Sequence, residues 1–151
     1  MSTITRTSVL SQYIDQLLAG ITIAGGYQTD IGLRHFRGRR NLDGSSAPCV
    51  SLIEGPDEPQ DQGAGREQVV IRQHYAISAH VPCDPDNPND AANDAVEDIR
   101  HALFRQGVTL GGAIKKLDYN GREIGTRADG EATVQVVVHV SALMAQDLVR
   151  S

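Results

Sequence analysis

Residues 67–82 constrain the fold most, because they predict a strand too long to lie flat inside a small domain. Apolar side chains recur at alternate positions, interrupted at Gln73, and Pro82 ends the segment: Val69, Ile71, Tyr75 and Val81. Fully extended, residues 67–81 would span about 50 Å. A compact domain of 151 residues is about 40 Å across. The strand must therefore bend, bulge or project, and we expect it or its hairpin to join subunits of a homo-oligomer.

Two segments have the periodicity of amphipathic helices. Residues 5–19 place apolar side chains on one stripe, and Gly20 follows as a C-cap: Val9, Leu10, Tyr13, Ile14, Leu17 and Leu18. A second helix is predicted from an Asn89 or Asp90 cap to about Arg105. Its early carboxylates and late arginines match the helix dipole.

The remaining periodic segments read as strands. They cover residues 29–37, 49–53, 114–119, 122–124 and 133–141, with a hairpin turn expected at Asn120-Gly121 and another turn at Asp129-Gly130. Strands and helices do not alternate regularly along the chain. The order therefore predicts an α+β fold, with an antiparallel or mixed sheet of four to six strands and two main helices on one face.

The length predicts one domain over residues 1–151. Residues 54–66 are rich in proline, glycine and acidic side chains, and we expect a mobile acidic loop there. The first residues lack the pattern of a signal peptide, and no apolar run is long enough for a membrane span. Cys49 and Cys83 are too few for a disulfide scaffold, which favours a reducing cytoplasm. Together these features predict a cytoplasmic protein with no membrane association.

The composition argues against two classes of nucleic-acid-binding protein. The net charge of −5 argues against a protein that binds duplex DNA, since such proteins carry a basic excess. Aromatic residues make up 4% of the chain, too few for stacking single-stranded bases.

No motif in the chain predicts catalysis. His80 and Cys83 have ligand-like spacing but no second pair, and the acidic run from Asp84 to Asp90 lacks the glycine and glutamate of a calcium loop. No phosphate-binding glycine loop or activated nucleophile is recognisable. We expect no enzymatic activity, no metal and no cofactor.

Charged residues gather in two neighbouring segments. A basic set precedes an acidic one: Arg34, Arg37, Arg39 and Arg40, then Glu54, Asp57, Glu58 and Asp61. The basic segment of one subunit could meet the acidic segment of its neighbour, because a guanidinium binds a carboxylate through two parallel hydrogen bonds. The alternative is that both are solvated surface loops.

Several stretches occur in an order that resembles one protein family. Between the first helix and the valine-rich last strand they read Gly26-Tyr27-Gln28-Thr29-Asp30-Ile31-Gly32, Pro48-Cys49-Val50-Ser51-Leu52-Ile53-Glu54-Gly55, Glu97-Asp98-Ile99-Arg100 and Tyr119-Asn120-Gly121-Arg122-Glu123-Ile124. Over roughly residues 8–143 the chain resembles the tail terminator (tail completion) proteins of long-tailed bacteriophages.

The resemblance implies a small α+β subunit that assembles as a hexameric ring. Such a ring caps the tail tube protein, ends its polymerisation and meets the head–tail connector protein, while DNA passes through the lumen without specific binding. The protein would be a virion component of the tail or neck, assembled in the host cytoplasm. A negative lumen suits this role because it repels phosphates.

We take as candidate subunit or partner contacts the two charged segments and the region of the expected hairpin: Arg34, Arg37, Arg39, Arg40, Glu54, Asp57, Glu58, Asp61, Arg66, Asn120 and Arg122. Two alternatives stay open. One is a head–tail connector or neck component, and the other is a small-molecule-binding α+β domain, since folds of this kind host many functions.

Overall fold

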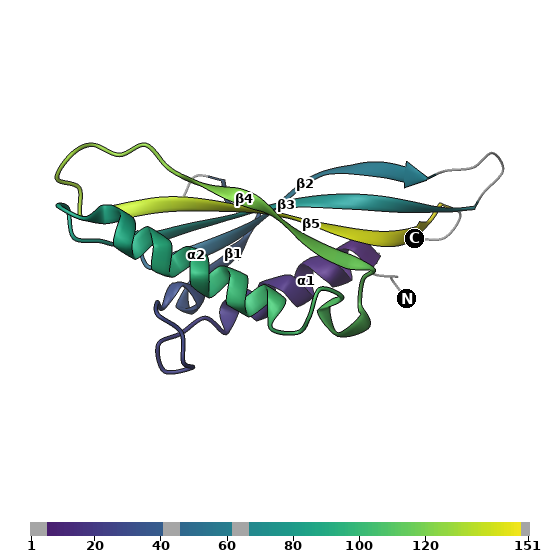
Figure 1. Ribbon diagram of the computed structural model, residues 1–151, viewed down its shortest axis with the longest axis horizontal. Helices are drawn as coiled ribbons and strands as arrows, with labels where there is room; N and C mark the ends of the chain where they lie inside the picture. The colour runs from purple at the N-terminus through teal and green to yellow at the C-terminus, as the bar shows by residue number, and fades with distance from the viewer. Residues whose placement is uncertain (1–5, 41–45, 62–66, 149–151) are drawn as a thin grey trace.

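The computed structural model describes residues 6–40, 46–61 and 67–148, and within them five strands form one mixed sheet with both helices on one face (Figure 1). The elements are α1 (Arg6–Ala19), η1 (Ile31–Leu33), β1 (His35–Arg37), β2 (Cys49–Asp61), β3 (Gln68–Pro82), α2 (Pro88–Phe104), η3 (Leu110–Gly112), β4 (Lys116–Ile124) and β5 (Thr133–Asp147). The sheet order is β1-β2-β3-β5-β4, in which β1 and β2 are parallel and the other neighbours antiparallel. The predicted α+β fold is confirmed.

The core lies between the sheet and the helices. Alternate side chains of β3 and β5 point toward the helices, as the period of two requires. α1 contacts β1 and β2, whereas α2 contacts β3, β5 and β4. The helix side chains that close the core are Leu10, Ile14 and Leu18 of α1, and Ala92, Ala95, Ile99 and Leu103 of α2.

The prediction of a long strand at residues 67–82 is confirmed. β3 pairs with β5 from Gln68 opposite Asp147 to Pro82 opposite Thr133. At one end β2, β3 and β5 reach past the helices (Figure 1). Gln73, which interrupts the apolar alternation, is buried, and its Nε2 donates to the carbonyl oxygen of Gly55 at 2.8 Å. That bond satisfies a polar group that would otherwise destabilise the core.

The expected loop at residues 54–66 is wrong for residues 54–61, which belong to β2. Prolines fit there because the register of β2 on β3 shifts twice, between Glu54 and Asp57 and between Pro59 and Asp61. β1 pairs only with Val50, Ser51 and Leu52, so the prolines lie on an edge, where proline is tolerated. Residues 62–66 lie outside the described part of the chain.

The hairpin turn expected at Asn120-Gly121 is also wrong. Residues on both sides of this pair belong to β4 and pair with the same strand, β5, with a register shift between Tyr119 and Arg122. Gly121 has φ +106°, which a bulge can require as much as a turn does. Asn120 is anchored by a 3.0 Å hydrogen bond from its Nδ2 to Ser141 Oγ.

Other boundaries differ by smaller amounts. The strand expected over residues 29–37 is limited to His35–Arg37 and follows the short helix η1. α2 begins at Pro88, after Asn87, because proline is well suited to the first helical position. β5 continues past residue 141 to Asp147, since β3 supplies a partner along its whole length.

Two close contacts fix the connection between α1 and β1. The buried Asp98 of α2 accepts hydrogen bonds from the backbone N–H of Gln28 (2.9 Å) and from the N–H and hydroxyl of Thr29 (both 2.7 Å). Gly32 packs so closely on the end of α1 that a Cβ there would lie 2.5 Å from the carbonyl oxygen of Leu18. These contacts dock the connection onto both helices.

Because of Tyr75, the free energy of unfolding is expected to depend on pH in the alkaline range. Its ring is buried, its hydroxyl lies 3.3 Å from Ser11 Oγ, and burial raises its pKa to about 12. Below about pH 10 both folded and unfolded chains hold the phenol proton. Between pH 10 and 12 only the folded chain does, so the free energy of unfolding is expected to fall by about 3 kcal/mol.

Urea denaturation at a series of pH values from 9 to 12 measures this loss. The matched variant is Tyr75→Phe, which cannot ionise at this position. We expect its stability to fall less steeply over that interval. Equal slopes for the two proteins would contradict the assignment.

Candidate functional site

The basic segment lies along the outer edge of the sheet. After β1 the chain turns away at Gly38 (φ +84°), whose N–H donates to the Leu52 carbonyl oxygen at 2.8 Å. Arg37 forms an exposed ion pair with Glu54 (3.2 Å). The guanidinium of Arg39 lies 4.2 Å from the centre of the Phe36 ring. The segment therefore displays cations at a sheet edge.

The other two predicted arginines have different surroundings. Arg34 donates to the carbonyl oxygen of Ser46 at 3.3 Å, within its own chain. Arg40 lines a hollow of about 670 Å³ together with residues of β2 and β3, among them His74 and Ile53. Arg66 lies outside the described residues, so its position in the expected set is not tested.

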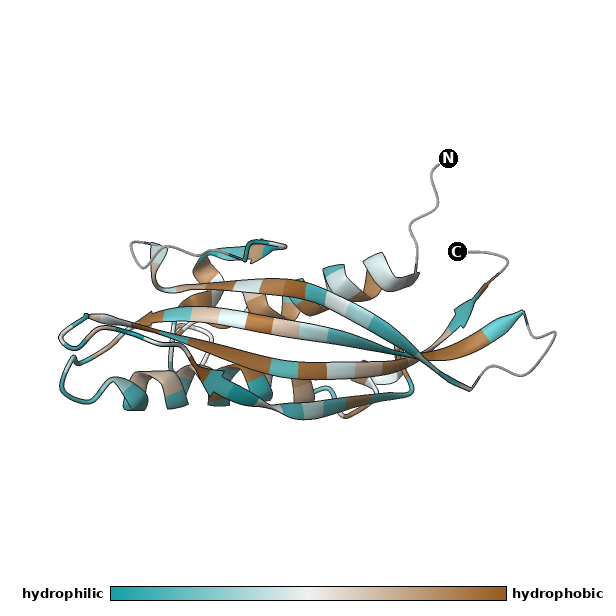
Figure 2. Ribbon diagram, turned by 90° about the horizontal axis from the view of Figure 1, so that it is seen from above, coloured by the Kyte–Doolittle hydropathy of each residue, from teal (hydrophilic) through white to brown (hydrophobic). Residues whose placement is uncertain are grey.

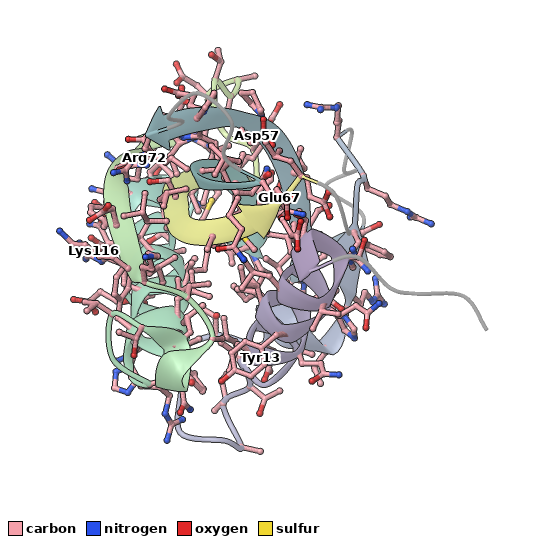
Figure 3. All side chains as sticks on the ribbon, turned by 90° about the vertical axis from the view of Figure 1, so that its right-hand side faces the viewer. Tyr13, Asp57, Glu67, Arg72 and Lys116 are labelled. Carbon is pink, nitrogen blue, oxygen red and sulfur yellow. The ribbon has the colours of Figure 1, made fainter. Side chains whose placement is uncertain are left out.

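The acidic residues lie on β2 and not in a loop. Glu54 forms an ion pair with Arg37, and Oε1 of Glu58 lies 2.6 Å from Nε2 of His74 on β3. Asp57 is exposed, and Asp61 pairs in register with Val70. Figure 3 views this projecting end and labels Asp57 and Glu67 there. Two of the expected carboxylates thus have a partner within the same chain.

The residues of the expected hairpin are also held internally. Asn120 donates to Ser141, as described, and Arg122 donates to Oδ1 of Asn93 on α2. The second contact ties β4 to the helix beneath it. Although β4 and β1 lie at opposite edges of the sheet, Asn120 lines the same hollow as Arg40 of the basic segment. Arg122 is not among the residues that line it.

The sheet face opposite the helices carries a polar network that the sequence reasoning missed. Arg72 Nη1 lies 2.6 Å from Asp118 Oδ2 and 3.1 Å from Ser141 Oγ, and Lys116 lies 3.2 Å from Asp118. The hydrogen bond from Arg72 holds the pKa of Asp118 below its usual range. His139 pairs with Glu123 at 2.7 Å. Figure 3 shows Arg72 and Lys116 on the flank that β4 forms.

A sequence signal for this network exists in the strand alternation. On β3 and β5 the residues between the buried positions include Arg72, His74 and His139, whereas Ser141 is itself buried. Figure 2, viewed from above the sheet, shows polar and apolar residues alternating along the strands. Their pairing across strands depends on the register, which the sequence alone does not provide.

Another hollow, of about 760 Å³, lies between α2 and the connection from α1 to η1, with Tyr27, Asp98 and His101 in its lining. Asp98 is committed to its three hydrogen bonds, and the rings of Tyr27 and His101 stack edge to face. Within residues 6–40, 46–61 and 67–148, no cluster of three His, Cys, Asp or Glu side chains could hold a metal ion. No helix in these ranges is both long and apolar enough to cross a membrane.

Comparison with known proteins identifies a shared fold. A chain from a solved structure described as the virion of a native gene transfer agent particle superposes with a TM-score of 0.55 at 14% sequence identity. The match covers 87% of this chain and 91% of the other. No protein-family model and no curated protein shows a significant match. The likeness extends over nearly the whole of both chains and establishes the architecture.

Proposed function

We propose that this protein is a structural component of a phage-like virion, and that it acts as a tail terminator. In this role it forms a ring on the end of the tail tube, ends polymerisation of the tube protein and meets the head–tail connector. The observation that carries the proposal is the architecture shared with a chain of a gene transfer agent virion over nearly the full length of both chains.

The projecting strands support assembly into an oligomer. β2, β3 and β5 extend past the helices, so part of the sheet has no helix layer beside it (Figure 1). Strand ends that leave the core are common contact sites, because their backbone and side chains are open to a second chain. In a virion protein, this end is a natural place for contact with another subunit or with the tube.

The charge of the molecule suits a channel for DNA. The net charge is −5, and the exposed residues at the projecting end include Asp57, Glu58 and Glu67. A ring with such groups toward its lumen repels the phosphate backbone, so DNA passes without being held. The proposed protein therefore contacts DNA only in transit.

Disruption of the gene tests the proposal directly. A tail terminator is required to stop the tube, so electron microscopy is expected to show tails of abnormal length that do not join heads. Supplying the wild-type protein from a second copy should restore tails of normal length. Tails of normal length beside unjoined heads would assign the protein to the neck instead, and intact particles would contradict both roles.

A further inference from the structure

Two separate surfaces of the subunit carry opposite charge. On the first surface the chain leaves β1 with Arg39 and Arg40, both exposed. Among the described residues, no carboxylate lies within ion-pair distance of either guanidinium. Arg37 beside them is already paired with Glu54. The β1 edge thus ends in two positive charges that form no ion pair within the described part of the subunit, although Arg39 lies over the Phe36 ring and Arg40 lines the hollow above the sheet.

The second surface is the face of α2 that points away from the sheet. Asp90, Asp94 and Glu97 follow one another at intervals of four and three residues, which places them on one stripe of the helix. Asp90 and Glu97 are exposed and Asp94 is half-buried. In the described ranges none of the three forms an ion pair. Partial burial and the carboxylates of Glu97, Asp98 and Asp90 raise the pKa of Asp94, which is the expected result of crowding like charges.

The arginines near this stripe contact other groups and not its carboxylates. Arg100 lies over the ring of Tyr119 (5.3 Å), Arg105 donates to the Tyr27 hydroxyl (3.3 Å), and Arg122 donates to Asn93. A carboxylate stripe alone would be only a solvated helix face. The two exposed arginines after β1 carry the opposite charge on a different part of the subunit, so the two surfaces are complementary between copies of the chain.

We propose that Arg39 and Arg40 of one subunit bind the Asp90–Asp94–Glu97 stripe of the next copy, head to tail. This rests on the ring of the proposed function and specifies its subunit contact. Because the arginines follow β1 and the carboxylates lie on the face of α2 that points away from the sheet, the contact joins two different surfaces. Such a head-to-tail contact forms a ring when its rotation closes. The proposed contact replaces the pairing expected with the acidic segment, in which Glu54 and Glu58 already contact Arg37 and His74 of the same chain.

Neutralising either surface tests the contact. The variants are Arg39→Gln with Arg40→Gln, and Asp94→Asn with Glu97→Gln. Sedimentation velocity in low salt, over a concentration series, is expected to show that each double variant associates about tenfold more weakly than the wild type. Gln12→Glu with Gln16→Glu on exposed positions of α1 is the matched control, since it shifts the net charge by the same amount as the arginine variant. Its association should stay at the wild-type level.

Charge reversal gives a sharper result. Arg39→Glu with Arg40→Glu, and Asp94→Arg with Glu97→Arg, should each give monomers alone because their own surfaces repel. Mixing the two variants should restore oligomers, because an alternating ring then places opposite charges at every contact. A wild-type chain that stays monomeric at its highest soluble concentration overturns the proposal, as does a mixture that stays monomeric.

The outcomes separate this contact from the proposed function. Wild-type rings that need both charged surfaces but do not bind tail tubes would retain the contact and contradict the tail terminator role. Tubes capped equally well by wild type and by the neutralised variants would retain the role and contradict the contact.

Discussion

Replacing Asp98 with alanine is expected to lower the free energy of unfolding by about 3 kcal/mol or more. The carboxylate is buried and accepts three hydrogen bonds from Gln28 and Thr29. Removing it leaves two backbone N–H groups without their acceptor and detaches the connection between α1 and β1 from α2. Urea denaturation followed by circular dichroism measures the loss.

Asp94→Ala is the matched control, because it removes a carboxylate from the same helix. Asp94 has no ion pair in the described residues, and neighbouring carboxylates surround it. Its removal is expected to change the stability by less than about 0.5 kcal/mol. Equal losses in the two variants would show that Asp98 does not anchor the connection.

Gly32→Ala is expected to destabilise the protein by about 3 kcal/mol. The added methyl group would lie 2.5 Å from the Leu18 carbonyl oxygen and 2.7 Å from that of Ala19. These are backbone atoms, which cannot rotate away as a flexible side chain would. Either η1 or the end of α1 must move, and the buried side chain of Ile31 next to the glycine moves with η1.

Gly20→Ala provides the comparison for this variant. A Cβ at Gly20 would lie 3.4 Å from the carbonyl oxygen of Leu17, which is an ordinary contact distance. We expect its thermal midpoint to stay close to that of the wild type. If Gly32→Ala unfolds at the same temperature as Gly20→Ala, the close approach of η1 to α1 is not needed for stability.

Much of the fold could be predicted because the apolar positions of its periodic segments are the positions that are buried in the structure. The alternation in β5 places Val134, Val136, Val138 and Val140 in the core, and the long strand β3 was expected from its spacing. Residues 54–61 could not be predicted from composition. Their prolines and acidic groups resemble a loop, but pairing with β3 decides their structure.

The surfaces were harder to predict than the fold. Asn120-Gly121 fits both a hairpin turn and a bulge, because both can use a glycine with positive φ. The ion pairs of Arg37 with Glu54 and of His74 with Glu58 depend on strand register, which is a long-range property. The sequence identified charged segments but could not show that part of their charge is neutralised within one subunit.

The edge of β2, with its bulges and prolines, has a consequence for how the addition of further subunits through the sheet is limited. Beyond Leu52 no described strand pairs with this side of β2, so it could template the addition of further strands. Pro56 and Pro59 have no N–H group to donate to an added strand. The two register shifts also interrupt the regular spacing of backbone groups that a continuous ladder of hydrogen bonds requires. This edge therefore disfavours the addition of a strand from another subunit. For a protein proposed to end a polymer, such an edge disfavours polymerisation of the subunit itself into a fibre.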